Sequence, residues 1–151
     1  MTDLAPYVEY LADTPVRTTM HYGRSLLDHL ITTSETLARW GHDHELQLAG
    51  LFHSYYAAVA QPTAHSRALV AEAIGSATEA LIFTYATGEP TTAPVKALRC
   101  LEAANAFDLA QFAARTRRDR DVLAQHLESL MPYLTTQGSS EVKAIMNGVL
   151  A

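Results

Sequence analysis

The sequence predicts an all-α protein, a single compact bundle of about six to seven helices. No segment alternates apolar and polar residues with period two over the length of a strand, whereas apolar residues recur at helical spacing along most of the chain. Glycine and proline punctuate these helical patterns at intervals that suit helices of ordinary length. A chain of 151 residues can bury one substantial core, so residues 1–151 are expected to form one domain.

The composition argues against several classes of function. Hydrophobic residues make up 48% of the chain and the formal net charge is −5, which suits a globular protein and not a nucleic-acid binder, because phosphate contacts need a basic face. Residues 115–120 are the only basic cluster, and we expect them at the end of one helix and the turn into the next. We expect no signal peptide, because the first residues lack a basic region followed by an apolar core, and no apolar run is long enough for a membrane span. The single cysteine, Cys100, excludes an internal disulfide and favours a cytoplasmic setting.

The first third of the chain predicts three helices. Residues 3–12 form a short helix that lies over the core as a lid or brace, and residues 15–20 form a connector. The first long helix covers residues 24–40 and stops at Gly41. Asp43 then offers an N-cap for a helix over residues 45–59.

The rest of the chain is also helical. Residues 66–85 keep a helical period that breaks at Gly75, and Thr87 to Thr92 is the clearest loop in the sequence. Pro94 fits the first turn of a long helix that ends near residue 115. Three elements complete the prediction: a helix over 121–133 interrupted at Pro132, a turn over 137–140, and a last helix over 141–149.

The helix predicted over residues 45–59 is apolar nearly all round and is therefore expected to be the central buried helix. His53 lies inside this apolar surface, and a buried imidazole needs partners for its ring nitrogens. Its neighbours on the helix face include the small residues Gly50 and Ala57. We expect them to leave space beside the His53 ring that a ligand occupies.

Two other polar side chains interrupt apolar faces. His29 lies at the border of the core face of the 24–40 helix, and Asn105 lies on the centre line of an apolar stripe. An unpaired buried amide costs about 1 to 3 kcal/mol, so Asn105 faces either a functional pocket or backbone carbonyls or a water. Polar groups from three helices of a bundle commonly form a metal or small-molecule site, which predicts that His29, His53 and Asn105 converge. The other histidines considered are expected at the surface: His42, His44, His65 and His126.

The segment Asp28-His29-Leu30, followed by Leu51-Phe52-His53-Ser54 with 24 residues between the two histidines, resembles the histidine-aspartate (HD) domain superfamily of metal-dependent phosphohydrolases and oxygenases. Residues 45–54 are similar to the alanine- and leucine-rich lead into the family's His-Asp pair. Asn105 falls where the family has its last aspartate, so the resemblance covers about residues 28–108. It implies a divergent HD-like branch with His-Ser in place of His-Asp.

The resemblance also implies a divalent metal, iron, manganese or zinc, with His29 and His53 as ligands. Ser54 and Asn105 replace two of the family's carboxylate ligands and bring no formal charge. A dication held mainly by two imidazoles is expected to bind weakly.

These observations favour an enzyme that acts on a small polar metabolite by acid–base or weakly metal-assisted chemistry, as a hydrolase or a lyase. His53 is the expected central group and His29 the second. The remaining predicted site residues are Tyr56 as a further catalytic group and Asn105, Ser54 and His21 as substrate contacts.

Two other functions stay open on the sequence. A protein derived from a metalloenzyme scaffold can bind a small molecule without turnover. Alternatively, the histidines and Asn105 form only a buried hydrogen-bond network in a structural or interaction protein. The substrate and the oligomeric state are not predicted.

Overall fold

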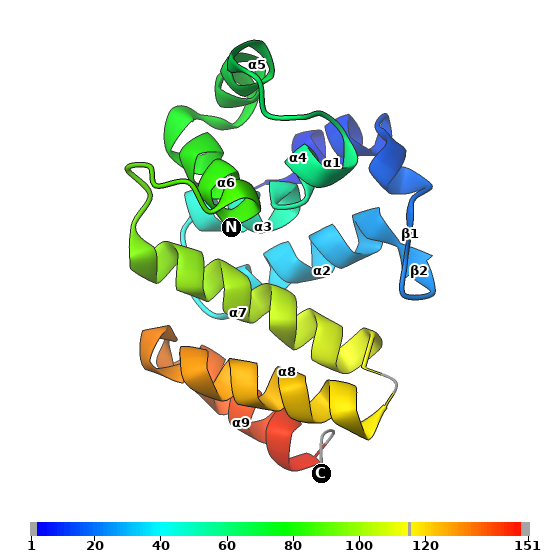
Figure 1. Ribbon diagram of the computed structural model, residues 1–151, viewed down its shortest axis with the longest axis vertical. Coiled ribbons are helices and arrows are strands. Elements are labelled where there is room, and N and C mark those ends of the chain that lie inside the picture. The colour runs from blue at the N-terminus through cyan, green and yellow to red at the C-terminus, as the bar shows by residue number, and fades with distance from the viewer. Residues whose placement is uncertain (1–2, 115, 149–151) are drawn as a thin grey trace.

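Helices make up nearly all the regular structure in the computed structural model, which describes residues 3–114 and 116–148 (Figure 1). The all-α bundle predicted from the sequence is confirmed. Among the residues described, none of the helices has the length and apolar character that a bilayer span requires. In chain order the elements are α1 (Ala5–Ala12), the 3₁₀ helix η1 (Pro15–Arg17), β1 (Met20–His21), β2 (Arg24–Ser25), α2 (Leu26–Arg39), α3 (His44–Phe52), α4 (Tyr55–Ala58), α5 (Ala64–Ile74), α6 (Ser76–Thr87), α7 (Val95–Phe112), α8 (Arg117–Leu130), the 3₁₀ helix η2 (Met131–Tyr133) and α9 (Thr136–Gly148).

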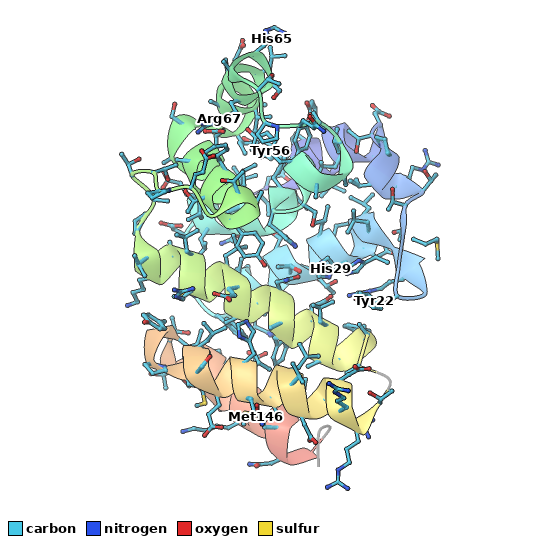
Figure 2. All side chains as sticks on the ribbon, in the orientation of Figure 1. Tyr22, His29, Tyr56, His65, Arg67 and Met146 are labelled. Carbon is cyan, nitrogen blue, oxygen red and sulfur yellow. The ribbon has the colours of Figure 1, made fainter. Side chains whose placement is uncertain are left out.

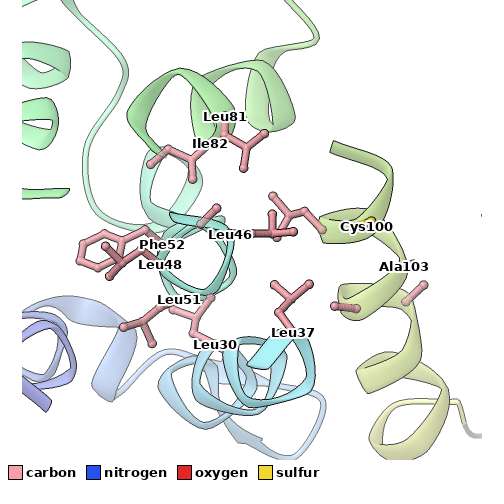
Figure 3. Packing of buried hydrophobic residues seen from close by; sticks show 14 of the residues in the cluster. Leu30, Leu37, Leu46, Leu48, Leu51, Phe52, Leu81, Ile82, Cys100 and Ala103 are labelled. Atoms are coloured by element: carbon pink, nitrogen blue, oxygen red, sulfur yellow. The ribbon is translucent and has the colours of Figure 1, made fainter. Parts of the chain in front are cut away.

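Helix α3 lies at the centre of the bundle and packs against α2, α6 and α7. Its last seven residues include six that are buried, as its nearly continuous apolar surface predicts. Asp43 caps its N-terminus by accepting a hydrogen bond from the Leu46 N–H at 3.0 Å. Figure 3 shows the core around α3, to which α2 contributes Leu30 and Leu37, α3 contributes Leu46, Leu48, Leu51 and Phe52, α6 contributes Leu81 and Ile82, and α7 contributes Cys100 and Ala103.

The helix predicted over residues 45–59 is divided in two, because α3 ends at Phe52 and α4 begins at Tyr55. His53 explains the division. Its Nδ1 donates to the carbonyl of Gly50 at 2.7 Å, and in a continuous helix that carbonyl accepts from the N–H of residue 54. The side chain of His53 thus competes with the backbone for the acceptor that would carry the helix onward.

The space predicted beside the His53 ring is not created by Gly50 or Ala57. A Cβ at Gly50 would lie 2.7 Å from Leu37 Cδ1 and 3.2 Å from Ser34 Cα, so the missing side chain lets α3 approach α2 closely. Ala57, the other small residue, is exposed. Neither residue leaves room at the imidazole.

The seven helices predicted along the sequence correspond to nine α-helices in the described residues, because two of them divide. The second division falls at Gly75, as predicted, where a φ of 92° suits a residue without a side chain. The turn predicted over 137–140 is wrong, since α9 already begins at Thr136. Thr135 caps this helix by accepting from the Gly138 N–H at 3.1 Å, and Trp40 packs against Gly138.

The short hairpin of β1 and β2 was not predicted, because its strands are only two residues long. Tyr22 and Gly23 form its turn with φ values of 52° and 86°, the positive values that tight hairpin turns of type I′ need. Ser25 ends the hairpin and caps α2 by accepting from the Asp28 N–H at 3.1 Å. The hairpin therefore lies beside the first turns of α2 (Figure 1).

Candidate functional site

Three buried ionisable side chains meet inside the bundle. His29 comes from α2, His53 from the end of α3 and Asp108 from α7. Their exposed fractions are 1%, 5% and 1%, so they have left bulk water almost completely. Figure 2 shows His29 in the layer between α2 and α7. Buried charged and polar groups need partners, and these three supply most of their own.

The hydrogen bonds of the two imidazoles define which nitrogen carries a proton. A carbonyl only accepts, so His53 Nδ1 carries the hydrogen that bonds the Gly50 carbonyl. The Nε2 of neutral His53 is then a lone pair. His29 Nδ1 meets Asp108 Oδ2, and a carboxylate likewise holds the hydrogen of the imidazole on that nitrogen.

The two remaining nitrogens, His29 Nε2 and His53 Nε2, are 3.3 Å apart. Two lone pairs at this distance repel each other, so the contact needs one proton between the rings. The Asp108 carboxylate contacts the opposite edge of the His29 ring and favours positive charge there. Burial, together with the neighbouring His29, lowers the pKa of His53 to about 4. At neutral pH His53 is therefore the proton acceptor of the pair.

Asp108 is half satisfied. Its Oδ2 accepts from both His29 and Arg24, while its Oδ1 accepts no hydrogen bond from any described residue. Arg24 also donates to Thr32 Oγ1 at 3.0 Å, and its guanidinium lies 4.2 Å from the ring centre of Phe112. An unpaired carboxylate oxygen buried to this degree is costly, so it is a place where a ligand gains by donating a hydrogen bond.

His21 covers His29 from the hairpin, with ring centres 4.4 Å apart and planes tilted by 36°. Its Nε2 is buried and has no hydrogen-bond partner within the described part of the chain. Burial lowers the pKa of His21, and the nearby His29 and Arg24 lower it further. His21 and Arg24, one from each strand, place the hairpin over the buried site.

Among the described residues, Asn105 forms no hydrogen bond with the ring of His29 or His53. Its Nδ2 donates to Tyr85 Oη at 2.9 Å, and the Tyr85 ring packs edge-on against His53 with ring centres 5.6 Å apart. Asn105 thus reaches the site through Tyr85. Burial raises the pKa of Tyr85 to about 12, so its hydroxyl stays protonated.

Asp108 is the residue that the sequence analysis missed on this helix. It lies seven residues after Leu101 and four after Ala104, both fully buried, so it belongs to the core face of α7. This spacing was the available signal. Asn105 is only half-buried, at the edge of the same face.

Tyr56, predicted as a catalytic group, lies in a different cluster. Its hydroxyl donates to Glu79 Oε1 at 2.8 Å, and Arg67 binds both oxygens of that carboxylate at 2.7 and 3.0 Å. Burial and the neighbouring Glu79 raise the pKa of Tyr56 well above its ordinary value. The guanidinium also lies 3.5 Å from the ring centre of Phe83. Figure 2 shows Tyr56 and Arg67 together, on the α5 side of the bundle and away from His29.

The other predicted residues are placed as follows. Ser54 is half-buried in the turn between α3 and α4, and its side chain does not cap α4. The surface positions expected for His42 and His44 are wrong, since both are half-buried and each has one buried ring nitrogen without a partner in the described structure. His65 is exposed, and His126 lies 3.1 Å from Glu102 on the surface.

His29, His53 and Asp108 do not together form a three-ligand metal site. His29 turns one edge of its ring to Asp108 and the opposite edge to His53, so the three groups do not point to a common centre. Within residues 3–114 and 116–148 no group of three or more His, Cys, Asp or Glu side chains is placed to hold a metal ion. Catalytic zinc sites commonly use three protein ligands. The metal implied by the resemblance stays a prediction of weak binding through His29 and His53.

Fold and site together define an all-α protein with a buried histidine-carboxylate cluster under a short hairpin. The family model described as a domain of unknown function, DUF6817, matches residues 10–89, more than half of the chain. The chain belongs to this family. The matched region contains His21, His29 and His53, while Asp108 lies beyond it. No curated protein and no solved structure matches the chain.

Proposed function

We propose that this protein is an enzyme that moves protons on a small polar molecule, with His53 as the base, His29 as the acid and Asp108 as the carboxylate that orients His29. The observation that supports this most directly is the 3.3 Å contact between the two Nε2 atoms. Each ring has its other nitrogen occupied, one by a carbonyl and one by a carboxylate. Each imidazole is therefore held in one tautomer, with its Nε2 facing the other ring.

The proposed roles follow from the charges. His53 is neutral at pH 7 because burial lowers its pKa to about 4, so its lone pair can accept a proton from a substrate. His29 is the proposed acid because the Asp108 carboxylate contacts its ring and favours positive charge there. Hydrolysis, elimination and cyclisation each need one proton removed and one supplied, so the pair suits a hydrolase or a lyase.

The unpaired atoms around the histidines indicate the kind of substrate. Asp108 Oδ1 is buried without a donor, and His21 Nε2 is buried without a partner among the described residues. A molecule with hydroxyl or amine hydrogens would satisfy the carboxylate oxygen. This favours a polar metabolite over an apolar one.

We further infer that the chain is a divergent relative of the HD superfamily. Asp108 supports this inference, because a carboxylate from a later helix contacts the first histidine of the motif. The departure at Ser54 and the diverging donor atoms support chemistry in which the imidazoles carry the protons.

The test begins with untagged protein purified without chelator. A thermal-shift screen of polar metabolites identifies molecules that raise the melting temperature, and these are then assayed for turnover. His53→Gln and Asp108→Asn are each expected to lower turnover by about 100-fold or more, the range of general acid–base catalysis. His126→Gln, on the surface of α8, is the matched control and should keep full activity. Full activity in both site variants contradicts the proposal, and elemental analysis of the same sample measures the weak metal binding.

A second function has one observation in its favour. The two Nε2 atoms touch each other and are almost fully buried, as in a network that only holds helices together. In that case no metabolite stabilises the protein. Replacing His29 with leucine would then lower stability, because the buried Asp108 carboxylate loses one of its hydrogen-bond donors.

A further inference from the structure

The surface beside the hairpin carries an unusual concentration of exposed apolar side chains. Met20 and Tyr22 on the hairpin, Phe112 at the end of α7 and Val122 on α8 are each more than half exposed. They come from the three segments that meet at one end of the bundle in Figure 1. Exposed apolar surface gathered in one place commonly marks a binding site.

A cleft of about 280 Å³ lies within this surface. Its volume is close to the lower limit of small-molecule pockets, about 300 Å³, which suits a ring-sized group. Tyr22 borders it on the hairpin side, and Arg118 and Val122 border it on α8. The rest of the lining is Leu109, Ala113, Ala114, Asp119 and Leu123.

Ring contacts within the hairpin lead from the cleft lining to the buried histidines. The Tyr22 ring packs edge-on against His21 with centres 4.8 Å apart, and His21 lies 4.4 Å from His29. On the other side, Arg24 contacts Phe112 at the surface and Asp108 in the site. Figure 2 shows Tyr22 at the hairpin and His29 deeper in the bundle behind it.

The cleft lining contains one cation, Arg118, and one carboxylate, Asp119. Asp119 is engaged with the backbone N–H of Thr116 at 3.3 Å, as part of the cap of α8. Arg118 is exposed at the same cleft and forms no ion pair within the described ranges 3–114 and 116–148. A guanidinium with no carboxylate partner is suited to bind a carboxylate, sulfonate or phosphate.

We propose that this cleft binds the apolar, ring-bearing part of the substrate and that Arg118 binds an anionic group on it. The inference rests on the proposed function, because it assigns cleft and histidines to one molecule. Tyr22 is the residue that recognises the ring, and its neighbour His21 contacts the part that reaches His29. The ligand class is thus an amphipathic small molecule with an aromatic or apolar ring and a negative charge.

The probe for the test is 8-anilinonaphthalene-1-sulfonate, an aromatic anion whose fluorescence rises on binding. Its neutral analogue, N-phenyl-1-naphthylamine, lacks the sulfonate. Tyr22→Asn removes the ring and suits the positive φ of this position, so the hairpin is retained. Arg118→Gln removes the charge at an exposed position.

We expect Tyr22→Asn to weaken the binding of both probes by about fivefold or more. Arg118→Gln should weaken the sulfonate probe to a similar degree and leave the neutral probe unchanged. The control is Ala38→Glu, which places a negative charge in a separate groove between α1, α2 and α3. This variant should leave both probes unaffected, because the cleft is elsewhere.

Three results would overturn the proposal: no binding of the sulfonate probe to the wild-type protein, binding of this probe to Tyr22→Asn and Arg118→Gln as tight as to the wild type, or weakened binding to Ala38→Glu alone. His53→Gln separates this inference from the proposed chemistry. It removes the base but should leave the affinity for both probes unchanged. Probe binding that follows Tyr22 and Arg118 therefore supports the cleft even when no turnover is found.

Discussion

Two buried carboxylates in this protein, Glu79 and Asp108, differ in how many of their oxygens accept hydrogen bonds. Glu79 on α6 has both oxygens engaged, by Tyr56 and by the two-pronged contact of Arg67. Asp108 on α7 concentrates its two partners, Arg24 and His29, on one oxygen and leaves the other buried without a donor. Both residues are at most 5% exposed, so burial alone does not distinguish them.

The difference shows which cluster is a structural brace and which can act on a ligand. A fully satisfied carboxylate gains nothing from a further donor, and Glu79 therefore joins α4, α5 and α6. A carboxylate with one unpaired oxygen is already desolvated, and that oxygen can still accept a hydrogen bond from a ligand. The two imidazoles with converging nitrogens lie only at Asp108.

The largest expected effect is the loss of stability that acid causes at the cluster containing His53. The folded protein binds a proton at His53 only near pH 4, whereas the unfolded chain binds it near 6.5. Stability contributed by neutral His53 is therefore complete above pH 6.5 and is lost as the pH falls to 4. We expect a loss of about 3 kcal/mol across this range from His53.

The measurement compares urea unfolding of the wild type and His53→Gln between pH 7 and pH 4. The groups that face His53 are His29 and His21, which lower its pKa, and Asp108 and the Gly50 carbonyl, which raise it. His21 and His42 also have lowered pKa values and contribute in the same direction in both proteins. Parallel curves for the two proteins would show that His53 does not cause the acid sensitivity.

Removing charge from each carboxylate is the second comparison. Glu79→Gln leaves a partly buried guanidinium without its partner and should cost about 2 kcal/mol, less than a fully buried pair because Arg67 is one-third exposed. Asp108→Asn should cost less stability, because half of this carboxylate is unsatisfied in the wild type. Urea unfolding at pH 7 gives both values. A larger loss for Asp108→Asn would make Asp108 the brace.

Helix positions were predictable because local rules decide them. Asp43 caps α3, Gly75 divides the 66–85 pattern and Pro94 precedes α7, each as the sequence indicated. The pairing of His29 with His53 was also predicted, since both interrupt apolar faces. For the helix positions, the deciding information lies within one or two helical turns.

The rest of the site depends on contacts between residues far apart in the sequence. Asp108 meets His29 across 79 residues and Arg24 across 84, and a charged side chain on an amphipathic helix ordinarily suggests a solvent face. The end of α3 was missed for a related reason. The capture of the Gly50 carbonyl by His53 depends on a side-chain rotamer that helical periodicity does not report.

The smallest expected loss of stability is that of Tyr56→Phe. Tyr56→Phe removes one hydrogen bond to Glu79 but leaves the Arg67 contacts in place, so stability should fall by about 1 kcal/mol. The neighbouring Tyr55→Phe is the matched control. Its hydroxyl forms a hydrogen bond with the half-exposed Tyr10 at 3.3 Å, so the loss should be smaller. Turnover on any metabolite found by the screen should stay at the wild-type level in both variants. A loss of turnover in Tyr56→Phe alone would restore the sequence-based assignment of Tyr56 to catalysis and would mean that the two carboxylate clusters work as one site.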